Sequence, residues 1–221
     1  MTKPVGLIMV DVPEAVLGMT RFVMDHCGIA VEPLPARRLR DKGGLDRFGA
    51  VLFPGGGSEL YRRDLGDDGI ANLKRFIQKG GGYVGICAGC IFAFETGLLT
   101  GSMFRMPGMG VHILQHRAAH DIFRGYPGRS GPFMLRVHGP LMEVAKPTRA
   151  LAYYDQDKRY AAVAVRTLGK GRVVGFSVHP EGGLAWGGGN YNPYFYFDGK
   201  VHKTCRMLRN ALNWVRRAPV K

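Results

Sequence analysis

Short apolar runs alternate with longer amphipathic segments over the first hundred residues. Each run has the length of a buried strand and is bounded by glycine, proline or charged residues. The runs are residues 6–10, 29–34, 49–53 and 82–86.

Helical patterns fill the gaps between these runs. Residues 67–81 begin with two aspartates, carry apolar side chains at helical spacing, including Ile70 and Leu73, and end in a lysine and two glycines. Helices are also predicted over 13–28 and over 88–97, each of which ends in a glycine. Strands that alternate with helices predict an α/β fold with a mostly parallel, doubly wound sheet.

The pattern changes after residue 98. Strand-like runs follow one another with only turns between them, which predicts an antiparallel strand extension before a last core strand. A helix with apolar residues on one face closes the chain over 201–217. We expect one domain over residues 1–221. The four later strand-like runs are residues 132–139, 149–155, 160–166 and 171–178.

Composition and charge narrow the class of protein. Hydrophobic residues make up 46% of the 221 residues, which indicates a compact globule. The formal net charge of +14 favours anionic substrates or acidic partners, but the basic residues are scattered, so nucleic acid is not expected as a partner. No segment is long enough to span a membrane, and four cysteines do not make a disulfide scaffold, so the cytoplasm is the expected location.

Candidate chemistry begins with Cys87 in "GGYVGICAGCIFAFETG", residues 81–97. This cysteine stands between a predicted strand and a predicted helix, with Gly85 and Gly89 around it in the pattern Gly-x-Cys-x-Gly, the thiol analogue of a nucleophile elbow. The turn places the sulfur at the carboxyl end of the sheet and at a helix N-terminus, which favours thiolate over thiol. The alternative is a small buried core residue.

A base and an orienting group for this nucleophile are found at the end of the last core strand. His179 and Glu181 flank a proline in "VVGFSVHPEGG", so both side chains can face the carboxyl edge of the sheet. None of the other six histidines has a carboxylate two residues further on at the tip of a core strand.

Oxyanion donors are expected after the third strand, where "FPGGG" places three glycines in a row. Backbone N–H groups there, with that of Ala88, could face a developing negative charge. Gly56 and Ala88 are the candidate donors. Gly55, Gly57 and Cys90 adjoin them and are candidates for substrate contact.

Two further patterns have other interpretations. Cys87 and Cys90 form a C-x-x-C motif, the spacing of disulfide oxidoreductases. His112, His116 and His120 would form one stripe on a helix, as metal ligands do, but a solvated or partly packed face is favoured and no metal is expected.

An aromatic, glycine-rich stretch follows the predicted acid at residues 186–199. Its position beside the expected site suits a lid or a stacking surface for substrate. A flap over the sheet edge or an oligomer contact would have the same composition.

The motifs "FPGGG", "GICAG" and "HPEGG", in this order, resemble the class I glutamine amidotransferase-like superfamily, whose fold is flavodoxin-like. The stretches "PGGGSELYRRDL", "IQKGGGYVGICAGCIFA" and "GKGRVVGFSVHPE" are similar, more narrowly, to the amino-terminal domain of eukaryotic biotin-protein ligases and its free-standing bacterial relatives. The similarity runs from about residue 5 to residue 185.

This resemblance implies a Cys-His-Glu triad of Cys87, His179 and Glu181, with Gly56 and Ala88 as oxyanion donors. It implies a cysteine hydrolase or amidotransferase-like protein that acts on a C–N bond of a small amide or peptide without a cofactor. The alternative is a catalytically silent binding domain of the same fold. The protein could form a homodimer.

The sequence departs from the family pattern at one position. Glutaminases of this superfamily usually have a glutamine four residues after the nucleophile, and this chain has Ile91 there. Glutamine hydrolysis is therefore not implied. No biotin-ligase catalytic region lies within the 221 residues, so ligation of biotin is not expected either.

Overall fold

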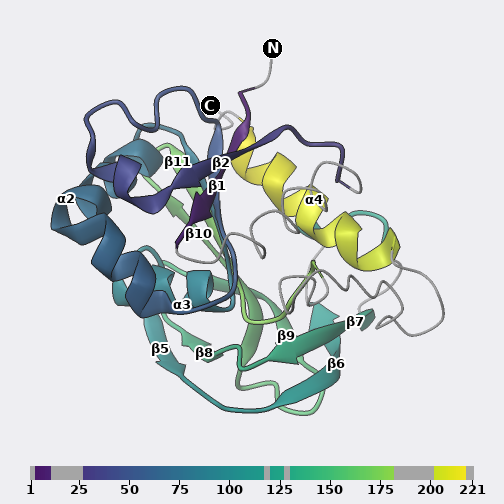
Figure 1. Ribbon diagram of the computed structural model, residues 1–221. Helices are drawn as coiled ribbons and strands as arrows, with labels where there is room; N and C mark the ends of the chain where they lie inside the picture. The colour runs from purple at the N-terminus through teal and green to yellow at the C-terminus, as the bar shows by residue number, and fades with distance from the viewer. Residues whose placement is uncertain (1–2, 11–26, 117–119, 127–129, 182–201, 218–221) are drawn as a thin grey trace, which may run out of the picture.

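The computed structural model describes residues 3–10, 27–116, 120–126, 130–181 and 202–217 (Figure 1). The helix predicted over 13–28 lies almost wholly outside these ranges, and so does the stretch 186–199. No helix in the described ranges is long and apolar enough to cross a bilayer.

The described residues form one mixed sheet of eleven strands in the order β2-β1-β3-β4-β11-β10-β9-β6-β7, with β8 beside β10 and β5 beside β8. The strands are β1 (Val5–Met9), β2 (Val31–Pro35), β3 (Ala50–Phe53), β4 (Gly82–Ile86), β5 (Gly101–Phe104), β6 (Met109–His116), β7 (Ser130–Val137), β8 (Leu141–Val144), β9 (Arg149–Tyr154), β10 (Ala161–Leu168) and β11 (Gly171–Phe176). The helices are α2 (Ser58–Gln78), α3 (Ala88–Glu95) and α4 (His202–Arg216), with short 3-10 helices η1 (Ala36–Arg40) and η2 (Asp121–Phe123).

Strands β2, β1, β3, β4 and β11 are parallel and carry the predicted doubly wound arrangement. Nearly all residues of β1, β3, β4 and β11 are buried, as expected where helices cover a parallel sheet, whereas the edge strand β2 is partly exposed. The carboxyl ends of β3, β4 and β11 lie side by side, since Leu52 pairs with Val84 and Val174 pairs with the same residue from the other side. The mostly parallel fold and the antiparallel extension are both confirmed.

The antiparallel part contains more strands than the pattern predicts. Strands β5, β6 and β8 are additions to it; residues 101–116 contain glycines and a proline that weaken any local strand signal. Strand β6 pairs with β7 on one side and with β9 on the other. Tertiary pairing therefore decides the conformation of this segment.

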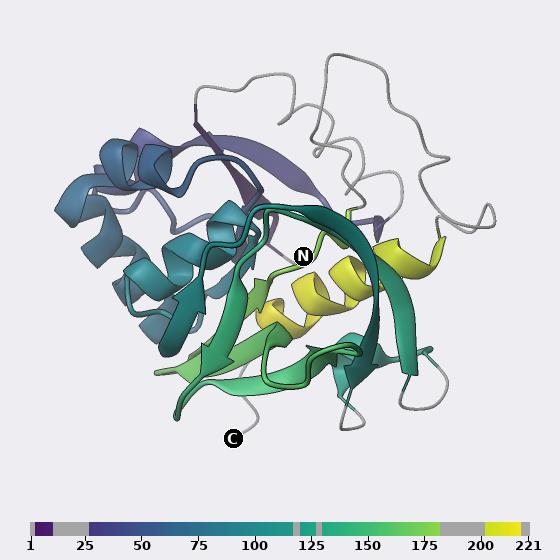
Figure 2. The same cartoon turned by 90° about the horizontal axis from the view of Figure 1, so that it is seen from below.

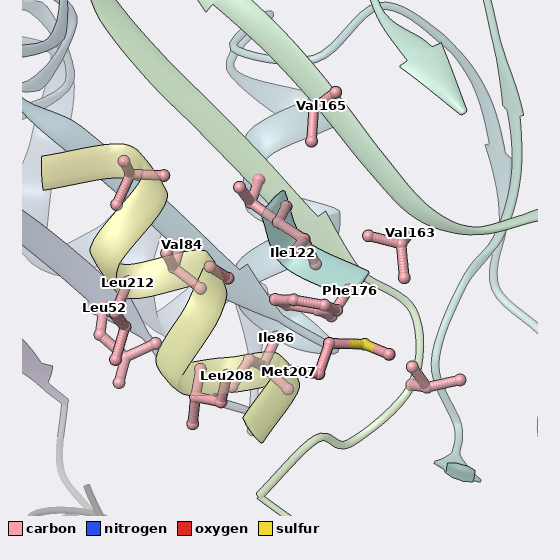
Figure 3. Close-up of a cluster of buried hydrophobic side chains, with 14 of the residues drawn as sticks. Leu52, Val84, Ile86, Ile122, Val163, Val165, Phe176, Met207, Leu208 and Leu212 are labelled. Carbon is pink, nitrogen blue, oxygen red and sulfur yellow. The ribbon is translucent and has the colours of Figure 1, made fainter. Parts of the chain in front are cut away.

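Two clusters of buried apolar side chains lie on opposite faces of the sheet. Helix α4 covers one face, where Met207, Leu208 and Leu212 pack on side chains of β3, β4 and β11 (Figure 3). Helices α2 and α3 cover the other face, where Phe53 stacks on Phe92 with ring centroids 5.4 Å apart. Because side chains alternate along each strand, neighbouring residues of β4 contribute to different clusters.

Helix α2 begins earlier than the predicted helix at residue 67. It starts at Ser58 and changes direction at Gly66, whose φ of 58° lies in the left-handed region. Arg40 donates from Nε to the carbonyl oxygen of Leu65, the residue just before this break. The glycine and this long-range contact together join two helical segments into one element.

Candidate active site

Cys87 lies in the sharp turn between β4 and α3, with φ 51° and ψ −105°. A non-glycine residue at positive φ is strained and persists only where its surroundings hold it. Glycines make the turn tight: a Cβ on Gly89 would lie 2.2 Å from the carbonyl oxygen of Phe53, and one on Gly85 would lie 2.5 Å from that of Gly89. The nucleophile-elbow geometry predicted for this stretch is therefore present in the backbone.

His179 and Glu181 follow the end of β11 and form a buried pair. Nδ1 of His179 lies 2.6 Å from Oε1 of Glu181, and neither side chain is exposed. Burial by itself would lower the pKa of His179, but the charge of Glu181 and the hydrogen bonds to Cys87 and Glu181 outweigh it and raise the pKa to about 10. The imidazole is therefore held in its protonated form at neutral pH.

The carbonyl oxygen of Val137 connects the sulfur and the ring. It lies 3.5 Å from Sγ of Cys87 and 3.3 Å from Nε2 of His179. A thiol at Cys87 can donate to this oxygen, and so can Nε2–H of the protonated His179 ring. The two reactive atoms thus meet at one backbone acceptor, and Cys87 is only 4% exposed beneath it.

The turn that carries Val137 is fixed by a buried chain of hydroxyl groups. Ser177 donates from Oγ to the carbonyl oxygen of Pro140, and the same Oγ contacts the Tyr154 hydroxyl. Gly139 passes so close to β11 that a Cβ there would lie 1.8 Å from the Ser177 carbonyl oxygen. Residues 137–140, the covering turn, therefore hold a defined position over the cysteine.

The glycine loop after β3 lies against the same pair. A Cβ on Gly55 would lie 3.2 Å from Cε1 of His179 and 3.6 Å from Cβ of Cys87. Gly56 follows with φ 135°, a conformation that glycine adopts without strain. The amide of Ala88 belongs to the first turn of α3, where helix N–H groups have no acceptor within the helix. Both candidate oxyanion donors thus come from segments beside the cysteine.

Cys90 is not part of this group. Its side chain is fully buried, and its sulfur lies 3.3 Å from Sδ of Met142 in the core beneath α2 and α3. Burial, and to a lesser degree the charge of Cys87, raise the pKa of Cys90 far above its ordinary value. The structure thus places the Cys90 sulfur in the apolar core on the other face of the sheet, whereas the predicted substrate contact would need it beside Cys87.

The histidine stripe belongs to a strand rather than a helix. His112 and His116 lie on β6, where residues four apart are about 13 Å from each other. His116 stacks on Phe123 with ring centroids 4.4 Å apart, and His112 meets Tyr154 edge-on at 5.0 Å. The described part of the chain has no group of three or more ligating side chains that could hold a metal. The rings of His112 and His116 thus pack against aromatic side chains.

Sequence reasoning missed Val137, Ser177 and Tyr154. Ser177 lies two residues before His179 on the same strand end, a position that would have marked it as a neighbour of the site. Val137 acts through its backbone, which leaves no signal in the residue type.

Comparison with known proteins finds relatives of the fold. A family model described as the N-terminal part of biotin-protein ligase matches residues 12–103. Sequence comparison with curated proteins finds no match. A chain in the structure of PurLQS from Thermotoga maritima is 16% identical, with a TM-score of 0.72, and the match covers 97% of this chain and 99% of that one.

Two other solved structures have the same fold. A glutamine amidotransferase from Thermotoga maritima is 17% identical, with a TM-score of 0.70, over 99% of this chain and 100% of that one. A protein from Thermoplasma acidophilum, described as a GMP synthase component, is 14% identical, with a TM-score of 0.64, over 96% and 94% of the two chains. The chain therefore has the fold of these glutamine amidotransferase structures, and its residues 12–103 match the family model of the biotin-protein ligase N-terminal part.

Proposed function

We propose that this protein is a cysteine hydrolase that cleaves a C–N bond in a small amide or peptide. The observation that carries the proposal is the meeting of Sγ of Cys87 and Nε2 of His179 at the Val137 carbonyl oxygen, with Glu181 behind the ring. A nucleophile, a base and an orienting carboxylate are arranged in the order that covalent catalysis requires.

The chemistry follows from these positions. The thiolate of Cys87 attacks the amide carbonyl carbon, and the backbone N–H groups of Gly56 and Ala88 stabilise the oxyanion. The C–N bond then breaks, and the imidazolium of His179 gives its proton to the leaving amine. Water attacks the resulting thioester as His179 takes a proton from it, and the C–S bond breaks to release the acid. The sum is one amide and one water consumed, and one acid and one amine formed.

Glu181 acts in this scheme without direct contact with the substrate. Its carboxylate accepts the Nδ1–H of His179 and keeps the ring charged until the leaving amine needs the proton. The position of Ile91 in place of the family glutamine favours an amide other than glutamine.

A silent binding domain of the same fold is the second candidate. The observation that favours it is the low exposure of Cys87 beneath the covering turn. In such a protein the triad residues would serve only to hold the turn and the elbow together.

One experiment separates the two candidates. A panel of small amides, peptides and esters is screened with the wild type, Cys87→Ala and Cys90→Ala. Hydrolysis should fall by about a thousandfold or more in Cys87→Ala and persist in Cys90→Ala. Activity that survives Cys87→Ala would overturn the proposed mechanism. No hydrolysis of any compound, together with a Cys87 that reacts with iodoacetamide no faster than an ordinary thiol, would favour the binding domain.

A further inference from the structure

Arg136 lies next to the covering turn and is buried, with 9% of its surface exposed. It precedes Val137 at the end of β7. Its Nη1 donates to the carbonyl oxygen of Met106 at 3.1 Å and to that of Gly139 at 3.3 Å. Met106 is 49% exposed, so the guanidinium connects the covering turn to an exposed segment.

The charge of Arg136 has no carboxylate partner among the residues that the structure describes. Its two acceptors are neutral carbonyl groups, and both are bonded to the same nitrogen. Arg105 differs, because its guanidinium is paired with Glu95 at 2.7 Å. A buried cation without a counterion is costly, since burial removes its water and nothing returns an opposite charge.

The guanidinium of Arg136 and the reactive atoms of Cys87 and His179 contact the same short turn. Arg136 bonds to the oxygen of Gly139, and two residues earlier the oxygen of Val137 contacts Cys87 and His179. Its field also acts on the interior: burial raises the pKa of Tyr154, and the charge of Arg136 opposes that rise. Arg136 is therefore close enough to influence a charged group on a molecule bound at Cys87.

We propose that Arg136 is a specificity-determining residue that selects substrates with an anionic group, such as a carboxylate, beside the reacting carbonyl. A guanidinium holds five N–H donors in a plane and can give two parallel hydrogen bonds to a carboxylate. A carboxylate on the substrate would supply the counterion that the described residues do not provide for Arg136. The inference rests on the proposed function for the identity of the reacting bond, and the net charge of +14 would assist the approach of such a substrate.

Two alkylating reagents of nearly equal size test this inference without a known substrate. Iodoacetate carries a carboxylate and iodoacetamide carries a neutral amide; with each, the Cys87 sulfur bonds to the CH2 carbon and iodide leaves. The measurement is the ratio of the two second-order rate constants at Cys87, followed by mass spectrometry. Any change in the thiolate fraction affects both reagents equally and cancels in the ratio.

The ratio of the iodoacetate rate constant to the iodoacetamide rate constant should fall roughly three- to tenfold in Arg136→Met, the loss expected when one charge is removed from a partly solvated site. Arg136→Lys keeps the charge and should keep most of the ratio, although it loses the planar donors. A purely structural Arg136 would instead change both rates together and leave the ratio unaltered, which would overturn the inference.

Arg166 provides a matched control. Its Nη1 also donates to two backbone carbonyl oxygens, those of Gly97 and Leu98, beyond the C-terminal end of α3 and away from Cys87. Arg166→Met removes one charge of the same kind and should leave the ratio within about twofold of the wild type. An equal fall in Arg166→Met would show that net charge alone sets the preference, and the inference would fail.

Wild-type protein offers a second measurement if Arg136→Met does not fold. Propionate should slow the alkylation of Cys87 by iodoacetamide at a lower concentration than propionamide does; equal protection would contradict the inference.

Hydrolysis of carboxylate-bearing and neutral amides at equal rates would also refute the inference about Arg136 while the proposed function stands. A shifted alkylation ratio without hydrolysis of any amide would refute the function and leave the anion site.

Discussion

Cys87 and Cys90 are three residues apart, yet the fold gives them opposite surroundings. Cys87 shares a carbonyl acceptor with His179, while Cys90 has Met142 as its neighbour and lies in an apolar cluster. Both are buried: Cys87 is 4% exposed and Cys90 is fully buried. The comparison shows that burial alone does not distinguish a candidate nucleophile from a core residue. The two are distinguished by the polar groups that lie next to the sulfur.

The helix between them produces the difference. Cys87 precedes the first residue of α3 and Cys90 lies within its first turn, so about three residues of helix turn the second sulfur toward α2 and away from the sheet edge. The two cysteines belong to separate clusters on the two faces of the sheet. In this structure both cysteines of the C-x-x-C motif are free, and they contribute to different clusters.

The largest expected effect is in the reaction of the two cysteines with iodoacetamide. Cys87 should be modified about a thousandfold faster than Cys90 in the native protein, because Cys90 becomes accessible only when its core opens. Fragmentation mass spectrometry of the peptide that contains both residues measures the two rates.

Cys27, which is also buried, serves as a reference for global opening. In a denaturing concentration of urea, Cys87 and Cys90 should react at similar rates. Equal rates in the native protein would mean that the contacts around Cys87 give it no special reactivity, and the contrast between the two residues would disappear.

The next effect concerns the buried His179–Glu181 pair. Since the folded protein raises the pKa of His179 to about 10, above an ordinary value of about 6.5, protonation of the ring stabilises the fold. This contribution is complete below about pH 6.5 and is lost as the pH rises through about 10. The free energy of unfolding should therefore fall by about 2–3 kcal/mol between about pH 6 and pH 9.

Glu181→Gln removes the charge that raises this pKa and should flatten that decline. Urea unfolding at several pH values measures both proteins, and the difference between their slopes cancels the titration of unrelated groups. Parallel slopes would show that Glu181 does not hold the proton on His179.

The smallest expected effect lies in the covering turn. Ser177→Ala leaves the carbonyl of Pro140 and the Tyr154 hydroxyl without their shared partner and should cost about 1–2 kcal/mol of stability. It should also raise the alkylation rate of Cys87 several-fold, because the turn over the sulfur loosens.

Alkylation of Cys90 in the same sample separates local loosening from general destabilisation. If both cysteines become more reactive by the same factor in Ser177→Ala, the turn has no separate role in covering Cys87. Thr96→Ser, a change at a buried hydroxyl that bonds to its own helix at Phe92, is the matched control.

Most of the parallel half of the fold could be predicted because its signals are local. The elbow at Cys87, the glycines at 55–57 and the pair at His179 and Glu181 each consist of neighbouring residues at the end of one apolar strand. Parallel strands then bring those ends to one edge of the sheet. The position of these residues at one edge of the sheet could thus be predicted from the sequence pattern and the sheet topology together.

The antiparallel half of the sheet and the covering turn could not be predicted in this way. Strand β6 has weak strand propensity and takes its conformation from its pairing with β7 and β9. Val137 contributes a backbone oxygen, which every residue type possesses. The side-chain direction of Cys90 depends on where α3 begins, and a shift of one residue in that boundary would rotate it by about 100°.

Strand β7 ends the sheet order, with four strands between it and β4, yet its last residue touches the cysteine that follows β4. The sheet must therefore curl back on itself, and α4 lies inside the curl, in contact with β4, β11 and β7 (Figure 2). During synthesis Cys87 is made before β7 and before His179. Under the proposed function, the arrangement of sulfur and imidazole can form only after residue 179 has been made and β7 has paired at the edge of the sheet.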